Sequence, residues 1–147
     1  MAENGTALVR RFIEEMINGN KLALADELFA PTYVDHTPGA PPVSPGPEGM
    51  RETVTVFRTA FPDDMRYTID DLFESGDRVA VRWTAGGTNT GPLMGMAPTG
   101  KAVSVSAVYI FRVEAGKLAE AWGDFDALGM QQQLGLLPAP GGAPPNR

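Results

Sequence analysis

Acidic residues occupy every second position in a stretch near the end of the chain. In "LAEAWGDFDALGM", Glu120, Asp124 and Asp126 lie two or four residues apart, and Trp122 falls on the same repeat. Residues two apart in an extended strand point to the same side, so we expect three carboxylates and a tryptophan on one face. Burying that face is costly unless the charges are compensated. The face therefore lies either in water or in a pocket where a carboxylate works as a base.

Asp126 and Asp124 are the two candidates for that base. A carboxylate that removes a proton from carbon needs a pKa raised toward the working pH, and a dry surrounding raises it. Trp122 can supply a wall of such a surrounding. In the other interpretation these aspartates begin a helix, because "DALGMQQQ" starts with a good capping residue. The two interpretations are compatible, so both stay open.

The only histidine, His36, lies in "YVDHTPG" just before a proline-rich loop. An imidazole with an ordinary pKa of about 6.5 can polarise a carbonyl or donate a proton. Alternatively, His36 pairs with Asp35 or with backbone at the mouth of a sheet. Large apolar residues can line a substrate site, although core packing is the alternative role for such residues. The residues that we expect to contact a substrate are Tyr33, Phe57, Met65, Trp83 and Trp122.

Length and composition limit the kind of protein. With 147 residues the chain is long enough for one hydrophobic core. The net charge of −6 and a single basic pair, Arg10-Arg11, speak against a nucleic-acid partner. No run approaches the roughly 18 apolar residues of a membrane span, and the first residues lack the pattern of a secretory signal, so we expect a cytoplasmic protein. The chain has no cysteine, which excludes thiolate chemistry and disulfides.

The elements that must position the candidate residues begin with helices. Apolar residues at helical spacing predict a first helix from Leu8 that stops at Asn18-Gly19. A second helix, with Asn20 as its cap, is expected to end before Pro31. After a short strand over 32–36, five prolines and two glycines make residues 37–47 a loop, either a lid or a rim.

The second half of the chain is predicted to be mostly strand. A third helix begins at Pro47 and carries an apolar stripe that ends at Phe61. Alternating patterns and glycine-containing turns then predict four strands, and "ALGMQQQLG" predicts one or two final helical turns. The strands are expected at 65–74, 78–90, 102–114 and 118–126. Helices first and long antiparallel strands second are typical of an α+β protein with a curved sheet covered by helices.

The order of elements and several spaced motifs resemble a known family. The motifs are "YVDHTPG", "GPEGM", "AFPDD", "ESGDRVAVRWTAGGTNTGPLMGMAPTGK", "IFRVEAGKLAEAWGDFDALGM" and "QQLG". Together they resemble the SnoaL-like polyketide cyclases of the nuclear-transport-factor-two-like superfamily. The resemblance implies a cone-shaped α+β barrel, in which a strongly bent, mostly antiparallel sheet is wrapped by N-terminal helices around an apolar cavity. We expect one such domain over residues 1–137 and a flexible Pro/Gly-rich tail over 138–147.

The resemblance also implies a reaction. Cyclases of this family use an aspartate near the end of the last strand to remove a proton next to a carbonyl, and the enolate closes a ring on a second carbonyl. The family pattern of Trp, three residues, Asp and then Gln-Leu-Gly is met by Trp122, Asp126 and residues 133–135. Asp126 is therefore the leading base and Asp124 its rival, with His36 as polarising partner and Trp122 as a wall.

The expected function is a cofactor-free cyclase or isomerase that acts on a polyketide-like, apolar, oxygenated small molecule. The family works without a metal, so we expect none, although His36, Asp124 and Asp126 include suitable ligand types. One alternative is an epoxide hydrolase or an epoxide-opening cyclase with paired acids, Asp124 with Asp126 or Asp35 with Asp126. Another alternative is a non-catalytic small-molecule binding protein. Members of the superfamily often pair through the open face of the sheet, so we also expect a homodimer.

Overall fold

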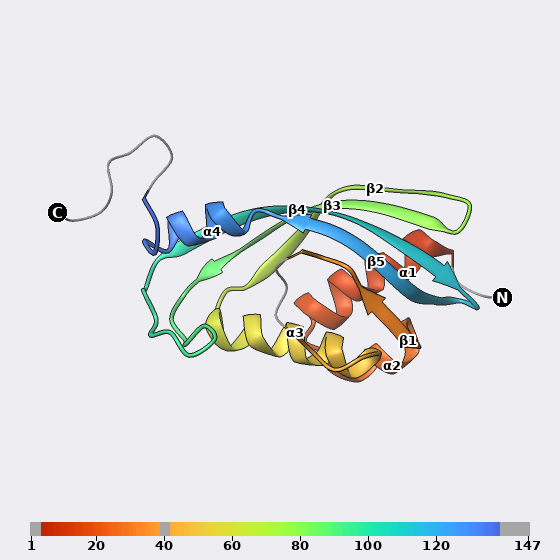
Figure 1. The fold of residues 1–147 in the computed structure, drawn as a ribbon, viewed down its shortest axis with the longest axis horizontal. Coiled ribbons are helices and arrows are strands. Elements are labelled where there is room, and N and C mark those ends of the chain that lie inside the picture. Colours follow the sequence, from red (N-terminus) through yellow and green to blue (C-terminus); the bar gives the residue numbers. More distant parts are fainter. Residues whose placement is uncertain (1–3, 39–41, 139–147) are drawn as a thin grey trace.

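The computed structural model describes residues 4–38 and 42–138. Within these residues, short helices are followed by one strand, a long helix, four more strands and a final helix (Figure 1). The elements are α1 Gly5–Arg11, the π-helix η1 Phe12–Asn18, the 3-10 helix η2 Leu22–Leu24, α2 Ala25–Leu28, β1 Phe29–Asp35, α3 Pro47–Ala60, β2 Arg66–Ser75, β3 Arg78–Thr88, β4 Ala102–Glu114, β5 Lys117–Phe125 and α4 Ala127–Gln133.

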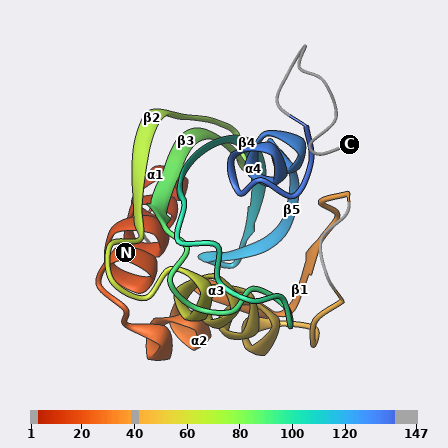
Figure 2. The same ribbon diagram turned by 90° about the vertical axis from the view of Figure 1, so that its left-hand side faces the viewer.

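The described strands form one sheet in the order β1-β5-β4-β3-β2. β1 runs parallel to β5, and every other neighbouring pair is antiparallel. The sheet curves strongly without closing on itself, and α1, α2 and α3 lie on its concave side (Figures 1 and 2). The predicted α+β architecture, a strongly curved and mostly antiparallel sheet covered by N-terminal helices, is confirmed.

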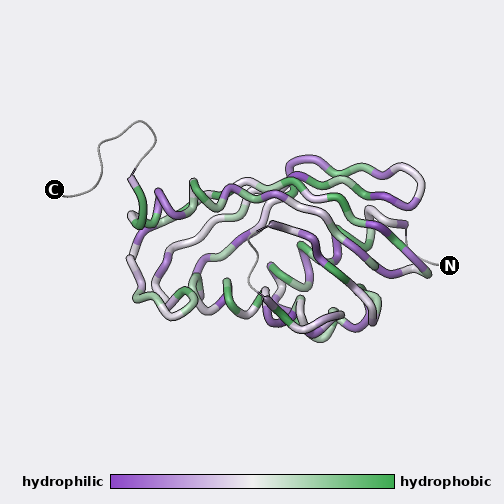
Figure 3. The backbone as a smooth tube through the Cα atoms, in the orientation of Figure 1, coloured by the Kyte–Doolittle hydropathy of each residue, from purple (hydrophilic) through white to green (hydrophobic). Residues whose placement is uncertain are grey.

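Irregular pairing within the sheet contributes to its curvature. The register of the β2–β3 pair shifts between Ile69 and Asp71 of β2, and that of the β4–β5 pair shifts between Leu118 and Glu120 of β5. Such bulges bend a strand and increase its twist. Hydrophobic and hydrophilic stretches alternate along the strands (Figure 3), as expected for a sheet with one face on the core and the other in solvent.

The first helical segment ends where the sequence predicts, but the second differs from the prediction. Helical backbone runs through α1 and η1 to Asn18, as expected. Asn20 adopts a left-handed φ of 55° and does not cap the next helix, so that expectation is wrong. Helix α2 ends at Leu28 because Phe29 is already extended and pairs with Leu118 of β5. The fully buried Phe29 ring also packs edge-on against Phe12, at 5.1 Å between centroids.

Helix α3 starts and ends close to its predicted limits. Pro47 occupies its first turn, where the missing N–H leaves no donor unsatisfied. The glycine before it, Gly46, has a φ of 74°, and a Cβ there would lie 2.6 Å from the carbonyl oxygen of Pro31. This glycine therefore lets the loop before α3 pass close to β1. Met50 and Val54 are buried on the face of α3 that points into the fold.

The four later strands lie within two residues of their predicted limits. Apart from Pro138, the tail predicted for 138–147 lies outside the described residues. In the part of the chain that the structure describes, no helix is both long and apolar enough to cross a membrane.

Candidate active site

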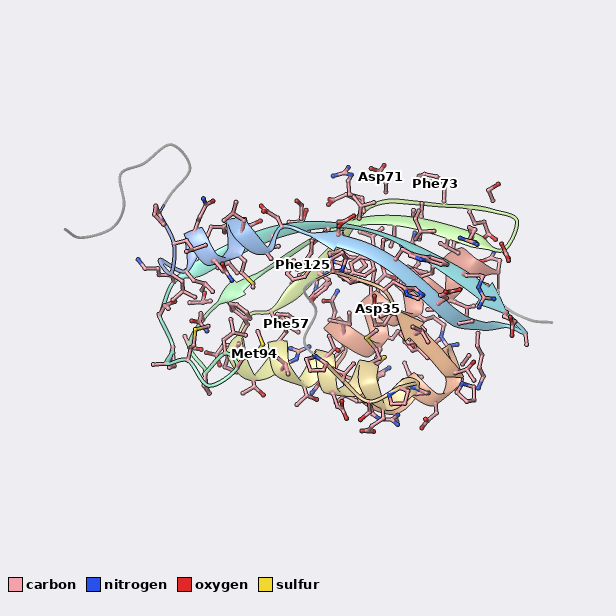
Figure 4. All side chains as sticks on the ribbon, viewed as in Figure 1. Asp35, Phe57, Asp71, Phe73, Met94 and Phe125 are labelled. Atoms are coloured by element: carbon pink, nitrogen blue, oxygen red, sulfur yellow. The ribbon has the colours of Figure 1, made fainter. Side chains whose placement is uncertain are left out.

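A cavity of about 510 Å³ occupies the concave side of the sheet. Its walls come from helices η1 and α3, from the loop before α3, from strands β1 to β5 and from α4. The lining is mainly apolar, and Asp35 is its only charged residue among those described. Figure 4 shows Asp35, Phe57 and Phe125 between the sheet and α3, whereas Asp71 and Phe73 point away from the other face. The apolar lining includes Phe12, Ile17, Met50, Val54, Phe57, Phe61, Met65, Trp83, Val103, Val105, Phe111, Phe125 and Met130.

Stacked aromatic rings form one wall of the cavity. The rings of Trp83 and Tyr109 lie nearly parallel, with centroids 4.6 Å apart and planes 13° apart. Tyr109 also stacks on Phe111 at 5.9 Å, and Tyr67 tilts against Trp83 at 5.7 Å. Trp83 reaches Tyr109 and Tyr67 at diagonal positions of the neighbouring strands, and Phe111 lies two residues after Tyr109 on the same face of β4. Flat aromatic walls suit a flat, ring-containing ligand.

A second region of the lining is polar, and it gathers at the end of β1. Both hydrogen bonds of the Asp35 carboxylate go to Oδ1, from the backbone N–H of Thr37 at 2.9 Å and from the Thr37 hydroxyl. Among the described residues Oδ2 receives no hydrogen bond. Two hydrogen bonds to Oδ1 fix the orientation of the carboxylate of a residue that lines the cavity.

Two tyrosine hydroxyls complete this polar end. Burial raises the pKa of Tyr109 to about 12, against the lowering effect of a hydrogen bond with the Thr37 side chain. The negative charge of Asp35 raises the Tyr109 pKa further. Burial also raises the pKa of Tyr33, and the charge of Asp35 adds to that shift. Both phenols therefore stay protonated near neutral pH and serve as hydrogen-bond donors. We refer to Tyr33, Asp35, Thr37 and Tyr109 as the polar end of the cavity.

The residues expected to contact a substrate divide into two groups. Tyr33, Phe57, Met65 and Trp83 line the cavity. Trp122 does not, because it projects from the opposite face of β5. Its neighbours Ala121 and Gly123 are buried toward the inside, and Tyr109 of the cavity wall pairs with Gly123.

The alternating face that includes Glu120 and Trp122 is thus the outer face of the sheet. Glu120 Oε1 accepts a hydrogen bond from Arg112 Nε at 2.9 Å, and Glu120 Oε2 lies 2.7 Å from His36 Nε2. The His36 ring stacks on Trp122 with centroids 5.4 Å apart, and the Arg78 guanidinium lies 4.8 Å from the centroid of that tryptophan ring. These charges are paired in an aromatic and ionic cluster on the outer face.

The three residues expected to be catalytic do not come together inside the cavity. His36 belongs to the outer cluster, and Asp124 lies beside it in a shallow outer groove with Trp122. Asp126 caps α4, and its Oδ1 accepts a hydrogen bond from the backbone N–H of Gly129 at 2.9 Å. Its side chain is exposed, yet its neighbour Phe125 lines the cavity, so Asp126 lies near the rim. No three described His, Asp or Glu side chains gather as metal ligands.

Asp35 is the site residue to which sequence reasoning gave too little weight. It entered only as a partner for His36 or as one acid of an epoxide-opening pair. The signal that identifies it is a two-residue repeat on β1, where Asp35 follows Tyr33 by two residues. In the pairing of β1 with β5, Asp35 lies beside the inward-facing Ala121, and Val34 lies beside the outward-facing Glu120. Asp35 and Tyr33 are therefore on the inner face of β1.

Comparison with known proteins defines the class. The family model described as SnoaL-like polyketide cyclase matches residues 7–134, and the chain belongs to this family. Among its relatives is the aklanonic acid methyl ester cyclase DnrD of Streptomyces peucetius, 30% identical over 134 residues that cover 87% of this chain and 88% of the relative.

Solved structures agree with this assignment. TsrD from Streptomyces laurentii superposes with a TM-score of 0.78 at 32% identity, covering 92% of this chain and 100% of that one. IdmH from Streptomyces antibioticus superposes with a TM-score of 0.76 at 32% identity, covering 90% of this chain and 99% of that one. Both likenesses extend over nearly the whole chain, so the cavity belongs to a fold shared with these proteins.

Proposed function

We propose that this protein closes a ring in a polyketide-like small molecule by carboxylate-catalysed enolate chemistry inside the cavity. The observation that carries the proposal is the composition of the lining, apolar and aromatic over most of its area with one carboxylate and two phenols at one end. An apolar wall holds a largely hydrocarbon ligand, and a few polar groups fix its orientation. The family relationship supports the same class of reaction.

In the proposed reaction a carboxylate removes a proton from a carbon next to a carbonyl. The electron pair of the broken C–H bond forms an enolate, whose carbon attacks a second carbonyl of the same molecule. The new alkoxide then takes a proton, so substrate and product are isomers. Only proton transfers and one C–C bond are involved, and the proposal therefore includes no cofactor. Holding a flexible chain with its two reacting carbons in contact lowers the entropic part of the barrier.

The position of Asp35 favours it as the base. Its Oδ2 has no hydrogen bond among the described residues, and Thr37 fixes the rest of the carboxylate. The residue is exposed, but the lining of an open cavity is itself accessible to water. A bound apolar substrate would displace this water, and desolvation makes a carboxylate a stronger base. The family pattern instead indicates Asp126, which is near the rim and already bonded to α4.

Two matched variants distinguish these carboxylates. Aklanonic acid methyl ester, the compound named for the relative DnrD, is a suitable first substrate, tested together with other methyl-ester polyketones. In heavy water, exchange of hydrogen for deuterium at the acidic carbon reports the base step alone. In ordinary water, a new chromatographic peak with the mass of the substrate reports ring closure. We expect Asp35→Asn to abolish both signals and Asp126→Asn to keep both.

Other outcomes would change the proposal in defined ways. If Asp126→Asn abolishes exchange and Asp35→Asn does not, Asp126 is the base, as the family pattern indicates. If both variants close the ring at the wild-type rate, the shape of the cavity acts without a base. Incorporation of oxygen from heavy-oxygen water would instead show epoxide hydrolysis. Tight binding with neither exchange nor product would identify a binding protein.

A further inference from the structure

Tyr33 carries a polar group that the fold itself leaves without a partner. The residue is 5% exposed, and its ring packs edge-on against the buried Phe29 with centroids 4.7 Å apart. Its hydroxyl is fully buried and has no hydrogen-bond partner among the described residues. A buried hydroxyl without a partner destabilises a protein, and native proteins rarely keep one without a reason. Phenylalanine would fill the same space without this cost.

The unpartnered hydroxyl belongs to a residue that lines the cavity. Tyr33 is on the same face of β1 as Asp35, two residues before it. The fold therefore holds a hydroxyl donor and a carboxylate at one end of an apolar space. The charge of Asp35 acts on the Tyr33 phenol, so the two groups share one end of the cavity, and a hydrogen-bond donor next to a base suits a carbonyl group and the carbon beside it. Burial and the charge of Asp35 also disfavour the phenolate form of Tyr33.

We propose that the Tyr33 hydroxyl donates a hydrogen bond to the substrate carbonyl that becomes the enolate oxygen when the neighbouring carbon loses its proton. This inference rests on the proposed function and deepens it, because it assigns the group that stabilises the developing negative charge. The Tyr33 proton stays on Tyr33 throughout. The base holds the proton removed from carbon and returns it to the alkoxide after ring closure.

A pair of ligands tests the hydrogen bond independently of turnover. Anthraquinone has two carbonyl oxygens, and anthracene has nearly the same shape with none. Removing one donor from a desolvated carbonyl should weaken binding of anthraquinone to Tyr33→Phe by about tenfold. Anthracene should bind Tyr33→Phe at least as tightly as it binds the wild-type protein. The infrared carbonyl band of bound anthraquinone should also move to higher frequency in the variant.

Each result decides a different point. Equal loss of affinity for both ligands would overturn the inference and give Tyr33 a structural role. Unchanged affinity and an unchanged carbonyl band would overturn it as well. If neither ligand binds the wild-type protein, both the inference and the proposed function fail. If the binding difference is found but no polyketone is cyclised, the inference holds for carbonyl recognition and the proposed reaction fails.

Turnover provides the kinetic test on a substrate that the wild-type protein cyclises. A donor to a developing oxyanion acts mainly in the transition state, so kcat should fall by roughly 100-fold in Tyr33→Phe, with a smaller change in KM. The melting temperature of the variant should equal or exceed that of the wild-type protein, because an unsatisfied hydroxyl is lost. A lower melting temperature together with a proportional loss of binding for all ligands would contradict the proposal.

Discussion

Gly123 on β5 offers a sharp test of how the aromatic wall is held. It pairs across the sheet with Tyr109, and a Cβ built on it would lie 2.2 Å from Cε2 and 2.3 Å from Cδ2 of the tyrosine ring. The ring cannot swing aside freely, because it is stacked between Trp83 and Phe111. The φ of Gly123 is not positive, so alanine fits the backbone there. The substitution Gly123→Ala should therefore act through overpacking alone.

The expected magnitude follows from two opposing effects. Overpacking in a well-packed interior destabilises by roughly 1–3 kcal/mol. Replacing glycine by alanine in a strand returns about 0.5–1 kcal/mol, because the unfolded chain has less conformational freedom to lose. We expect a net loss of about 1–2 kcal/mol, which for a chain of this size lowers the melting temperature by roughly 3–8 °C. Displacement of Tyr109 should also weaken binding of anthraquinone.

Equilibrium urea unfolding and thermal melts at one fixed protein concentration measure this loss. The matched control is Gly123→Ala in a Tyr109→Ala background, where the ring that causes the clash is absent. There we expect the alanine to be neutral or slightly stabilising, so that the double-mutant cycle gives a coupling of about 1–3 kcal/mol, the size of the overpacking effect. An equal loss in both backgrounds, or none in the wild-type background, would refute the argument that Tyr109 lies over Gly123.

Three further predictions concern the outer face and the end of β5. Hydrogen bonds from Arg112 and, to a smaller extent, from His36 lower the pKa of Glu120. The ionised Glu120 side chain therefore stabilises the fold above its unfolded pKa of about 4.3, and this stabilisation is lost as the pH falls through the lowered pKa. The difference in melting temperature between the wild type and Glu120→Gln should shrink below about pH 4. Asp126→Ala should destabilise by about 1 kcal/mol in urea unfolding through loss of the cap, whereas Asp126→Asn should be nearly neutral. Light scattering after size exclusion should show a homodimer, and Val108→Arg, at a half-exposed position on the outer face, should give a monomer.

Much of the fold follows from local patterns in the sequence. The apolar stripe on α3 and the alternation of apolar and polar residues in β2 to β5 each indicate an element that packs one face against a core. The structure places these elements within two residues of their predicted limits. The second helix was less predictable, because long-range pairing competes with helix propensity there. Phe29 leaves the helix to pair with Leu118, a residue far along the chain, and no local pattern contains this pairing.

The site was harder to predict than the fold. Alternation of residue types along a strand shows which residues share a face, but it does not show whether that face points into the cavity or into solvent. The repeat through Glu120 and Trp122 is regular, but Glu120 pairs with Arg112 of β4, and the Trp122 ring is covered by Arg78 of β3. With those partners a carboxylate face is stable outside the cavity. The inner face of β5 carries two small residues, Ala121 and Gly123, which give no chemical signal in a sequence, and continues with Phe125 in the cavity wall. Their small size leaves room for the cavity wall.

The outer cluster and the polar end of the cavity are connected through β1. His36 directly follows Asp35, the last residue of β1, and the two side chains lie on opposite faces of the sheet. On the outer face, the His36 ring contacts Glu120 and Trp122. The backbone N–H of His36 donates a hydrogen bond to the carbonyl oxygen of Ala121 at 2.8 Å. These contacts fix the end of β1 against β5 at the residue that follows Asp35. The segment around Trp122 thus holds the end of β1, next to the carboxylate in the cavity, from the opposite side of the sheet.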